Sequence, residues 1–505
     1  MDSNRQLKLG VIFTYLSIGI NILTGLLYTP WMISSIGTNN YGLYTLANSV
    51  IAFFMFDFGL SSAITRFVAK YLAEGRIDKV NNCLGLVYRL YIYIDVVIFI
   101  ILSVIYFLIP EIYKELTPDE IVKFKVVYSM AAFFSVLSFP FIPVNGILTA
   151  SEQFVPLKLC EVGQKILIVI AMTTSLLLGY GLYALVLVNV FAGIVTIIAK
   201  VYFIKKRTGI SINYKYKENK EFKEIISFSG WTSAISFSQR FVFSIVPTLL
   251  GSLTGSVAIA IFGIANVLEG YVYTFASAIG GMFLPKVNRI YAEGEGDILP
   301  LMIKIGRIQF IITGAIIIGF ICLGYDFINI WVGDSFAESY LCTVIIILPS
   351  FFSAPQQVAN EAVLAKNKVR KQAIIYLWTA LINLTAAFVF IYFGGVMGAC
   401  IAICLTYFIR WYLTNIALYR KELGINVLLF YKETLIKFFP IFLISLFIGI
   451  LANILFPNVS IVSFVIKSLI FAFAYLMGVY FSLNDYEREL IILPLNNVLK
   501  KIFKH

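Results

Sequence analysis

Histidine is almost absent from the sequence, because the single one, His505, is the last residue. Without internal histidines, neither a His-Glu-x-x-His zinc site nor a Ser-His-Asp triad can form. No Gly-Lys dipeptide occurs, so a P-loop for nucleotide phosphates is excluded, and no Asp-x-Asp pair is present to hold the metal of a sugar-nucleotide site. The six cysteines form no Cys-x-x-Cys pair and lie mostly in apolar runs, as small hydrophobic groups. We therefore expect no cofactor, and a membrane glycosyltransferase is the disfavoured alternative.

Charged residues are also scarce, at 13% of the 505 residues, whereas hydrophobic residues reach 60% and the mean hydropathy is +0.90. A soluble domain of this size needs more polar surface. The net charge of +12 is spread over short clusters between apolar runs, without the interleaved aromatic residues of a nucleic-acid groove. These clusters indicate membrane topology instead, because Lys and Arg keep loops in the cytoplasm.

The apolar runs predict an all-α polytopic membrane protein with fourteen transmembrane helices, since a run of about 20 apolar residues crosses the hydrocarbon core. The predicted spans are 9–30, 43–64, 84–108, 124–147, 160–178, 181–203, 225–249, 257–283, 305–325, 340–362, 373–393, 396–418, 435–455 and 461–482. Most cations fall on one side, three (Lys114, Lys123 and Lys125) fall on the other, and Arg240 and Lys467 fall within spans. Both termini are therefore predicted to be cytoplasmic.

Short motifs recur in the two parts of the chain and indicate an internal duplication. AEGRID at 73–78 matches AEGEGD at 292–297, Pro140, Asn145 and Ala150 match Pro355, Asn360 and Ala365, and Gly181 matches Gly395. The repeat covers six spans, so both copies enter the membrane in the same direction and are related by an axis along the membrane normal. The predicted domains are a six-helix bundle at 1–208, a second at 209–424, and two extra helices with a tail at 425–505. The two matching prolines either kink their helices or mark the entry into a loop.

TPWMISSIGTNNYGLYTLANSV at 29–50, followed by DFGLSSAITRFVAKYLAEGR at 57–76, resembles the opening helices of a known family. The Gly37, Tyr41, Gly42 and Tyr44 turn and the Asp57-Phe58-Gly59 element carry the likeness. The chain resembles the polysaccharide transporters, or Wzx-type flippases, of the multidrug/oligosaccharidyl-lipid/polysaccharide (MOP) superfamily. This resemblance implies a MATE-like fold with a cavity lined by helices 1, 2, 7 and 8.

The resemblance implies a function as well: export of undecaprenyl-diphosphate-linked oligosaccharide repeat units across the bacterial cytoplasmic (inner) membrane, for O-antigen in lipopolysaccharide biosynthesis, capsule or exopolysaccharide. A lipid II flippase is the alternative within the same fold. The implied partners are membrane lipid, a polysaccharide polymerase and a chain-length regulator. Without an ATP site, the energy would come from proton or sodium coupling or from the membrane potential.

Ionisable side chains at membrane depth are the first candidates for a site, because burial in lipid costs at least about 2.5 kcal/mol. Arg240 is interpreted either as a cation for the diphosphate or as an internal partner of Glu269, and Glu269 either couples cation movement or neutralises Arg240. Asp57 is a proton or cation site or, preferably, a polar brace beside Gly59.

Four other ionisable residues have weaker signals. Asp95 is expected to pair with Arg89 or with water. Arg66 and Arg89 lie at the cytoplasmic ends of their helices, where they either bind an anionic headgroup or serve only to keep the adjoining loops in the cytoplasm. Lys467 is expected to snorkel to the interface.

Intramembrane amides complete the candidate set: Asn21, Asn48, Gln239, Asn266 and Asn383. Such amides usually join helices. The first four lie on spans 1, 2, 7 and 8, so they are also candidate ligands for sugar hydroxyls.

Overall fold

The computed structural model describes residues 3–54, 60–216, 218–280, 287, 290, 297–366, 368–484 and 487–488. These residues are helical apart from short connections, and no strand occurs among them. Within them, ten helices are long and apolar enough to cross a membrane by length and composition. The predicted all-α membrane fold is confirmed, whereas the count of fourteen spans stays a prediction.

The contacts divide the chain into two compact units, which are described separately below. Unit 1 comprises Met1–Gly263 and Ala373–Thr406, and unit 2 comprises Ile264–Gln372 and Tyr407–His505. The predicted domains at 1–208, 209–424 and 425–505 remain a prediction.

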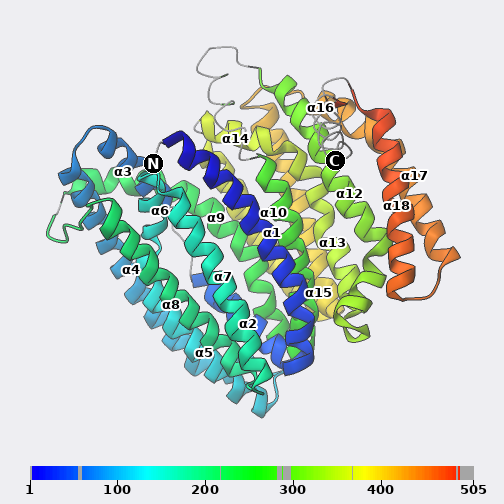
Figure 1. Cartoon of the computed structure of the whole chain (residues 1–505), viewed down its shortest axis with the longest axis horizontal. Coiled ribbons are helices and arrows are strands. Elements are labelled where there is room, and N and C mark those ends of the chain that lie inside the picture. The colour runs from blue at the N-terminus through cyan, green and yellow to red at the C-terminus, as the bar shows by residue number, and fades with distance from the viewer. Residues whose placement is uncertain are drawn as a thin grey trace, which may run out of the picture. The chain divides into compact units, whose positions relative to one another are not determined.

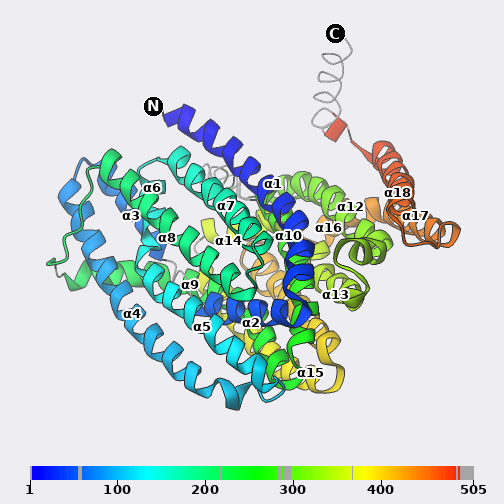
Figure 2. The ribbon, with the colours of Figure 1, turned by 60° about the horizontal axis from the view of Figure 1, so that its bottom comes forward.

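Unit 1 is a bundle in which α1 lies along α7, and α7 packs on α8 (Figures 1 and 2). Its elements are α1 (Ser3–Ile36), α2 (Thr38–Phe54), α3 (Leu60–Ala73), α4 (Ile77–Ile112), α5 (Pro118–Ser138), η1 (Phe139–Phe141), α6 (Pro143–Ala150), α7 (Phe154–Leu177), α8 (Leu182–Arg207) and α9 (Asn219–Leu253). The beginning of α10 (Ser256–Gly280) and the 373–406 part of α15 (Val369–Thr414) complete it.

Unit 2 is arranged around α12 (Leu299–Val332), which packs against α13, α17 and α18. Its other elements are the rest of α10, η3 (Asp334–Phe336), α13 (Glu338–Ser353), η4 (Ala354–Gln356), α14 (Gln357–Ala365), the ends of α15, η5 (Asn415–Arg420), α16 (Val427–Glu433), α17 (Leu435–Leu455) and α18 (Ile461–Ser482). The two C-terminal helices, α17 and α18, pack on each other as well as on α12.

The two matching prolines interrupt their helices in the same way. Pro140 lies in the 3₁₀ turn η1 between α5 and α6, and Pro355 lies in the 3₁₀ turn η4 between α13 and α14. Proline cannot donate a helical hydrogen bond, and a short 3₁₀ turn absorbs the break. A 3₁₀ turn thus interrupts the α-helix at both positions, and the kinks themselves stay a prediction. Most of the second AEGEGD motif lies outside the described residues.

Predicted spans 373–393 and 396–418 are continuous within α15, apart from one residue. Gly395 has φ of 54° and ψ of −134°, a conformation that side chains with a Cβ rarely adopt. Three residues later, a Cβ on Gly398 would lie 1.8 Å from the carbonyl oxygen of Phe390. Glycine at both positions therefore permits the reversal of the chain between the two spans.

The Gly-x-x-x-Tyr-Gly-x-Tyr turn has a direct structural explanation. Gly37, with φ of 83°, separates α1 from α2. A Cβ on Gly42 would lie 2.1 Å from the carbonyl oxygen of Ser256, so only glycine lets α2 approach the start of α10 this closely. The hydroxyl of Tyr44 accepts a hydrogen bond from Asn189 of α8 over 3.0 Å. The motif therefore joins α2 to two other helices of unit 1.

A buried carboxylate, Glu120, reinforces the same contact. It accepts hydrogen bonds from the backbone nitrogen of Thr117 at 2.9 Å, from Asn39 at 3.1 Å and from the hydroxyl of Ser256 at 2.6 Å. The bond to Thr117 is half of a capping box that begins α5. One side chain thus ties together the starts of α2, α5 and α10.

Candidate functional site

The polar side of α8 faces away from its exposed apolar side. Its most exposed apolar side chains include Leu187, Phe191, Ile198 and Tyr202. Asn189 and Lys200 follow Leu187 and Ile198 by two residues, and Thr196 precedes Ile198 by two. At 3.6 residues per turn, a shift of two residues is about 200° around the helix. These three side chains therefore point into unit 1 rather than toward lipid.

The same division holds on α7. Its exposed apolar residues Leu159, Ile166, Ile170 and Leu177 recur every four to seven residues along one face. Three charged residues, Lys158, Glu161 and Lys165, follow the spacing i, i+3, i+7 along another face and are only half-exposed. Because Lys200 of α8 lies within electrostatic range of Lys158 and Glu161, this charged face of α7 is turned toward α8.

These residues form what we call the lysine cluster, consisting of Lys158, Lys165 and Lys200 with Glu161 and Asn145. Lys158 pairs with Glu161 at 2.8 Å, and Lys200 donates to the Asn145 amide oxygen at 2.9 Å. Lys200 also lies within electrostatic range of Glu161 and Lys158. Lys165 has no hydrogen-bond or ion-pair partner among the residues that the structure describes. The cluster thus carries three cations and one anion.

The lysine cluster was not singled out from the sequence. Lys165 lies inside the predicted fifth span, 160–178, and Lys200 lies inside the predicted sixth span, 181–203, yet the count of cations places both with the basic residues of the cytoplasmic side. In the structure, Lys165 is eleven residues into α7, about 16 Å along the axis at 1.5 Å per residue. Positions 158, 161 and 165 lie on a different face of the helix from the exposed apolar residues, and this spacing is the sequence signal that identifies the lysine cluster.

On α9, Arg240 is exposed and Gln239 is half-buried. Arg240 forms no ion pair with the described residues of unit 1. Glu269 and Asn266 are half-buried on the part of α10 that belongs to unit 2, three residues apart and so on one face. Since Arg240 and Glu269 belong to different units, both interpretations of this pair remain predictions.

Arg89 has a structural role that the sequence did not predict. Its guanidinium donates to the carbonyl oxygens of Tyr214 and Tyr216, at 2.5 and 2.6 Å, and so holds the connection after α8 against α4. The expected pairing with Asp95 is therefore not found. Asp95 is half-buried on α4, and its Oδ1 atom is enclosed without a partner among the described residues. Its predicted role in substrate binding stays a prediction.

The remaining candidates differ in exposure. Arg66 of α3, Asn21 of α1 and Asn48 of α2 are exposed, and Asn48 lies within hydrogen-bond reach of the Tyr44 hydroxyl. Asp57 lies outside the described residues. Asn383 is fully buried, donates to the carbonyl oxygen of Val242 and accepts from Thr406. Asn383 thus joins helices, as expected for an amide in a membrane bundle.

In unit 2, the expectation that Lys467 snorkels is wrong. Its ammonium forms an ion pair with Asp326 of α12 at 2.5 Å, and the two side chains are only 2% and 7% exposed. A lysine that snorkels would extend to the interface, whereas this one is enclosed by a carboxylate on a neighbouring helix. The pair fastens α18 to α12.

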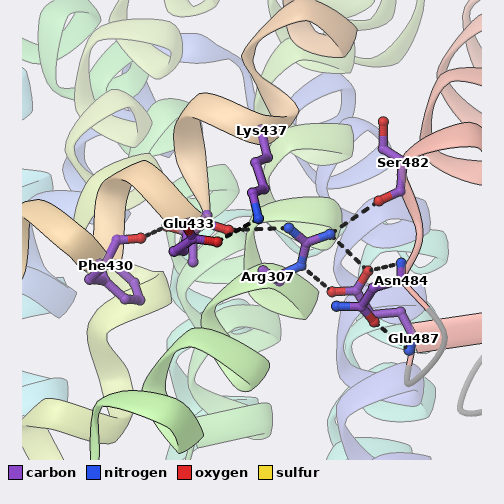
Figure 3. Close-up of polar contacts among 8 residues, drawn as sticks. Arg307, Phe430, Glu433, Lys437, Ser482, Asn484 and Glu487 are labelled. Atoms are coloured by element: carbon purple, nitrogen blue, oxygen red, sulfur yellow. Dashed lines mark hydrogen bonds and ion pairs between the residues drawn. The ribbon is translucent and has the colours of Figure 1, made fainter.

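A second buried ion pair lies at the other end of α12 (Figure 3). Arg307 pairs with both carboxylate oxygens of Glu487, and it also donates to the carbonyl oxygens of Glu433 and Ser482, each at 3.1 Å. Its guanidinium stacks 4.6 Å from the centre of the Phe438 ring. These partners join α12, α16, α17 and the segment after α18, so Arg307 has a structural role.

With this geometry described, comparisons place the chain among known proteins. Residues 7–290 match the family model described as "Polysaccharide biosynthesis protein". A comparison with curated proteins gives no match.

Solved transporters share the fold. The lipid II flippase MurJ in an inward closed conformation matches with a TM-score of 0.71 and 15% identity, covering 96% of this chain and 99% of the flippase. An inward-facing multidrug resistance transporter of the MATE family matches with a TM-score of 0.63 and 15% identity, over 82% and 96% of the two chains. A MOP superfamily transporter from Pyrococcus furiosus, whose binding pocket is described as reversed in polarity, gives 0.58 and 14%, over 84% and 98%.

Identities this low show the fold alone, and they confirm the predicted MATE-like architecture. The family match is the stronger finding, because it covers more than half of the 505 residues. The chain belongs to the polysaccharide biosynthesis protein family, and it shares its fold with transporters of the MOP superfamily.

Proposed function

We propose that the chain is a flippase that moves undecaprenyl-diphosphate-linked oligosaccharide repeat units from the inner to the outer leaflet of the bacterial cytoplasmic membrane. The observation that supports this most is the inward-facing polar side of α8, with Asn189, Thr196 and Lys200, in a chain of the polysaccharide biosynthesis family. Polar side chains at membrane depth must face protein or water. A polar path along this side of α8 would suit the sugars and phosphates of the substrate, while its lipid tail stays in the bilayer.

The substrate's own charge supplies a driving force. Moving two negative charges outward through an inside-negative potential of 100 mV releases about 4.6 kcal/mol, at about 2.3 kcal/mol per charge. Directional flipping therefore needs no nucleotide, and coupling to protons or sodium ions would add to this force. In this proposal Arg240, exposed on α9, binds the diphosphate through its planar fork of donors.

The test is flipping by the purified protein in proteoliposomes that contain a fluorescent undecaprenyl-diphosphate oligosaccharide. Flipping should be faster than in empty liposomes and faster still with an outward-driving potential. Arg240→Lys should slow it, and Arg240→Ala should slow it more. Full activity of Arg240→Ala would remove Arg240 from the mechanism, and no flipping by the wild-type protein would refute the function.

A lipid II flippase is the second candidate, favoured by the extent of the structural likeness. The lipid II flippase structure covers 96% of this chain, whereas the multidrug transporter covers 82%. Both candidates carry a polyprenyl diphosphate and differ in the sugar. Rescue of a strain depleted of its lipid II flippase would favour the second candidate, and rescue of a strain lacking a repeat-unit flippase would favour the first.

The pathway is part of the proposal. O-antigen, capsule and exopolysaccharide units share the diphosphate carrier, and a polysaccharide polymerase with its chain-length regulator would use the exported unit. The placement of both termini in the cytoplasm is supported by the basic connections between spans.

A further inference from the structure

The lysine cluster has more positive charge than its surroundings neutralise. Glu161 is the one carboxylate among its members, and it is already paired with Lys158. Lys200 has only the neutral amide of Asn145 as its hydrogen-bond acceptor. α1, which packs along α7, contains no Asp or Glu between Ser3 and Ile36. Lys165 and Lys200 therefore form no ion pair with the described residues, although Lys200 lies within electrostatic range of Glu161.

Lys165 and Lys200 are half-exposed, and the hydrogen bond between Lys200 and Asn145 is exposed, so an anionic ligand can reach both ammonium groups and supply the missing negative charge. Both lysines lie on the sides of their helices that are turned away from the exposed apolar residues, so lipid does not surround them. Lys200 is seven residues from the end of α8, about 10 Å along the axis. Lys165 is about 16 Å into α7, counted from its start at the same side of the membrane.

The cations are therefore arranged at two depths, one near the cytoplasmic mouth and one further in. A single phosphate would need only one of these positions, whereas a diphosphate has two phosphoryl groups and enough charge to meet both in turn. The ammonium groups act as point charges, which tolerate a moving anion better than the fixed fork of arginine does.

We propose that Lys200, Lys165 and the amide of Asn145 form a binding site for the diphosphate group of the lipid carrier on its way into unit 1. Lys200 and Asn145 receive the anion at the mouth, and Lys165 receives it deeper in the bundle. Glu161 forms an ion pair with Lys158 and so lowers the net positive charge of the lysine cluster. This lower charge weakens the attraction for the anion enough for it to leave the site. This assignment rests on the proposed flippase function.

The experiment measures binding to the purified full-length protein in detergent micelles by native mass spectrometry. The probes are undecaprenyl diphosphate, undecaprenyl monophosphate, inorganic pyrophosphate and phosphatidylglycerol. The variants are Lys165→Gln and Lys200→Gln. Lys205→Gln is the matched control, because Lys205 is exposed on the last turn of the same helix as Lys200. Unchanged thermal unfolding midpoints show that the variants are folded.

Each of the two glutamine variants should weaken undecaprenyl diphosphate binding by about tenfold or more, the size of one hydrogen bond to a charged group. Lys205→Gln should bind like the wild type, and Lys165→Arg should recover much of the affinity. Undecaprenyl monophosphate should bind more weakly than the diphosphate. Higher salt should weaken binding by screening the charges.

Three results would overturn parts of the account, and they can be told apart. If the wild type binds and flips the lipid diphosphate but both glutamine variants match Lys205→Gln, the lysine site is wrong and the flippase function stands. If pyrophosphate binds with lysine dependence but the lipid diphosphate does not, the lysines bind free diphosphate, and both the assignment to the lipid carrier and the flippase function fail. Equal, lysine-dependent binding of phosphatidylglycerol would show a general site for anionic lipid and refute the diphosphate assignment.

Discussion

The buried pair between Lys467 and Asp326 gives the sharpest prediction about stability. Lys467→Met keeps most of the side-chain volume and removes the ammonium, which leaves the Asp326 carboxylate enclosed without its 2.5 Å partner. Insertion scales assign at least about 2.5 kcal/mol to a lone charge at membrane depth. Removal of one partner of a buried pair costs about 3–5 kcal/mol in soluble proteins. We therefore expect Lys467→Met to lower the free energy of unfolding by about 3 kcal/mol.

The double variant Lys467→Met with Asp326→Leu tests the reason for this loss. If the cost comes from the stranded carboxylate, removing it should bring stability back to within about 1 kcal/mol of the wild type. The control is Lys437→Met, because Lys437 forms an exposed ion pair with Glu433 near the start of α17. Exposed pairs contribute little, so this change should cost less than about 1 kcal/mol.

The assay is reversible unfolding in mixed micelles, followed by circular dichroism, for the three variants and the wild type. A double variant as unstable as Lys467→Met would show that the cost is lost packing rather than an unpaired charge. A single variant as stable as the wild type would show that Lys467 reaches water in solution, as the sequence had suggested.

Three further changes test contacts elsewhere in the chain. Gly42→Ala places a Cβ 2.1 Å from the Ser256 carbonyl oxygen and should lower stability by about 1–3 kcal/mol in thermal unfolding. The control is Gly19→Ala, which should not change stability because nothing lies within 4 Å of that Cβ. Equal unfolding midpoints for the two variants would contradict the close approach of α2 to α10. Arg89→Gln removes two charge-assisted hydrogen bonds to the connection after α8, so trypsin should cut that connection about tenfold faster or more, and an unchanged rate would refute the clamp. Hydrogen bonds from two lysines lower the pKa of Glu422 to about 2, so its contribution to stability should be present above about pH 4.5 and lost as the pH falls toward 2. The gap in unfolding midpoint between the wild type and Glu422→Gln should therefore close over this pH range, and a constant gap would contradict the shift.

The helical framework could be predicted from the sequence because it depends on local properties. Apolar runs determine which segments enter a membrane. Pro140 and Pro355 interrupt their helices whatever their tertiary surroundings, because proline cannot donate a helical hydrogen bond. The short turn at Gly395 follows from glycine's conformational freedom. These features need no knowledge of which helices are neighbours.

The polar contacts could not be predicted in the same way, because they join residues far apart in the chain. Lys467 and Asp326 are separated by 141 positions, and Arg89 binds carbonyl groups 125 and 127 positions away. Hydropathy places each residue at a depth but does not identify its partner. The lysine cluster was missed for a different reason: counting cations by side of the membrane assigned Lys165 to topology, although its helical phase separates it from the lipid-facing residues.

The most direct test of a polar passage within unit 1 is the accessibility of single cysteines in intact inverted membrane vesicles. In a background without native cysteines, cysteine at positions 165, 196 and 200 should react with a membrane-impermeant thiol reagent. Undecaprenyl diphosphate should slow the reaction at 196, where Lys165 and Lys200 are both retained. Cysteine at positions 166 and 198, which replaces the exposed apolar residues Ile166 and Ile198, should remain unmodified. Reaction at the two apolar positions but not at the three polar ones would contradict a water-filled path along the inner faces of α7 and α8.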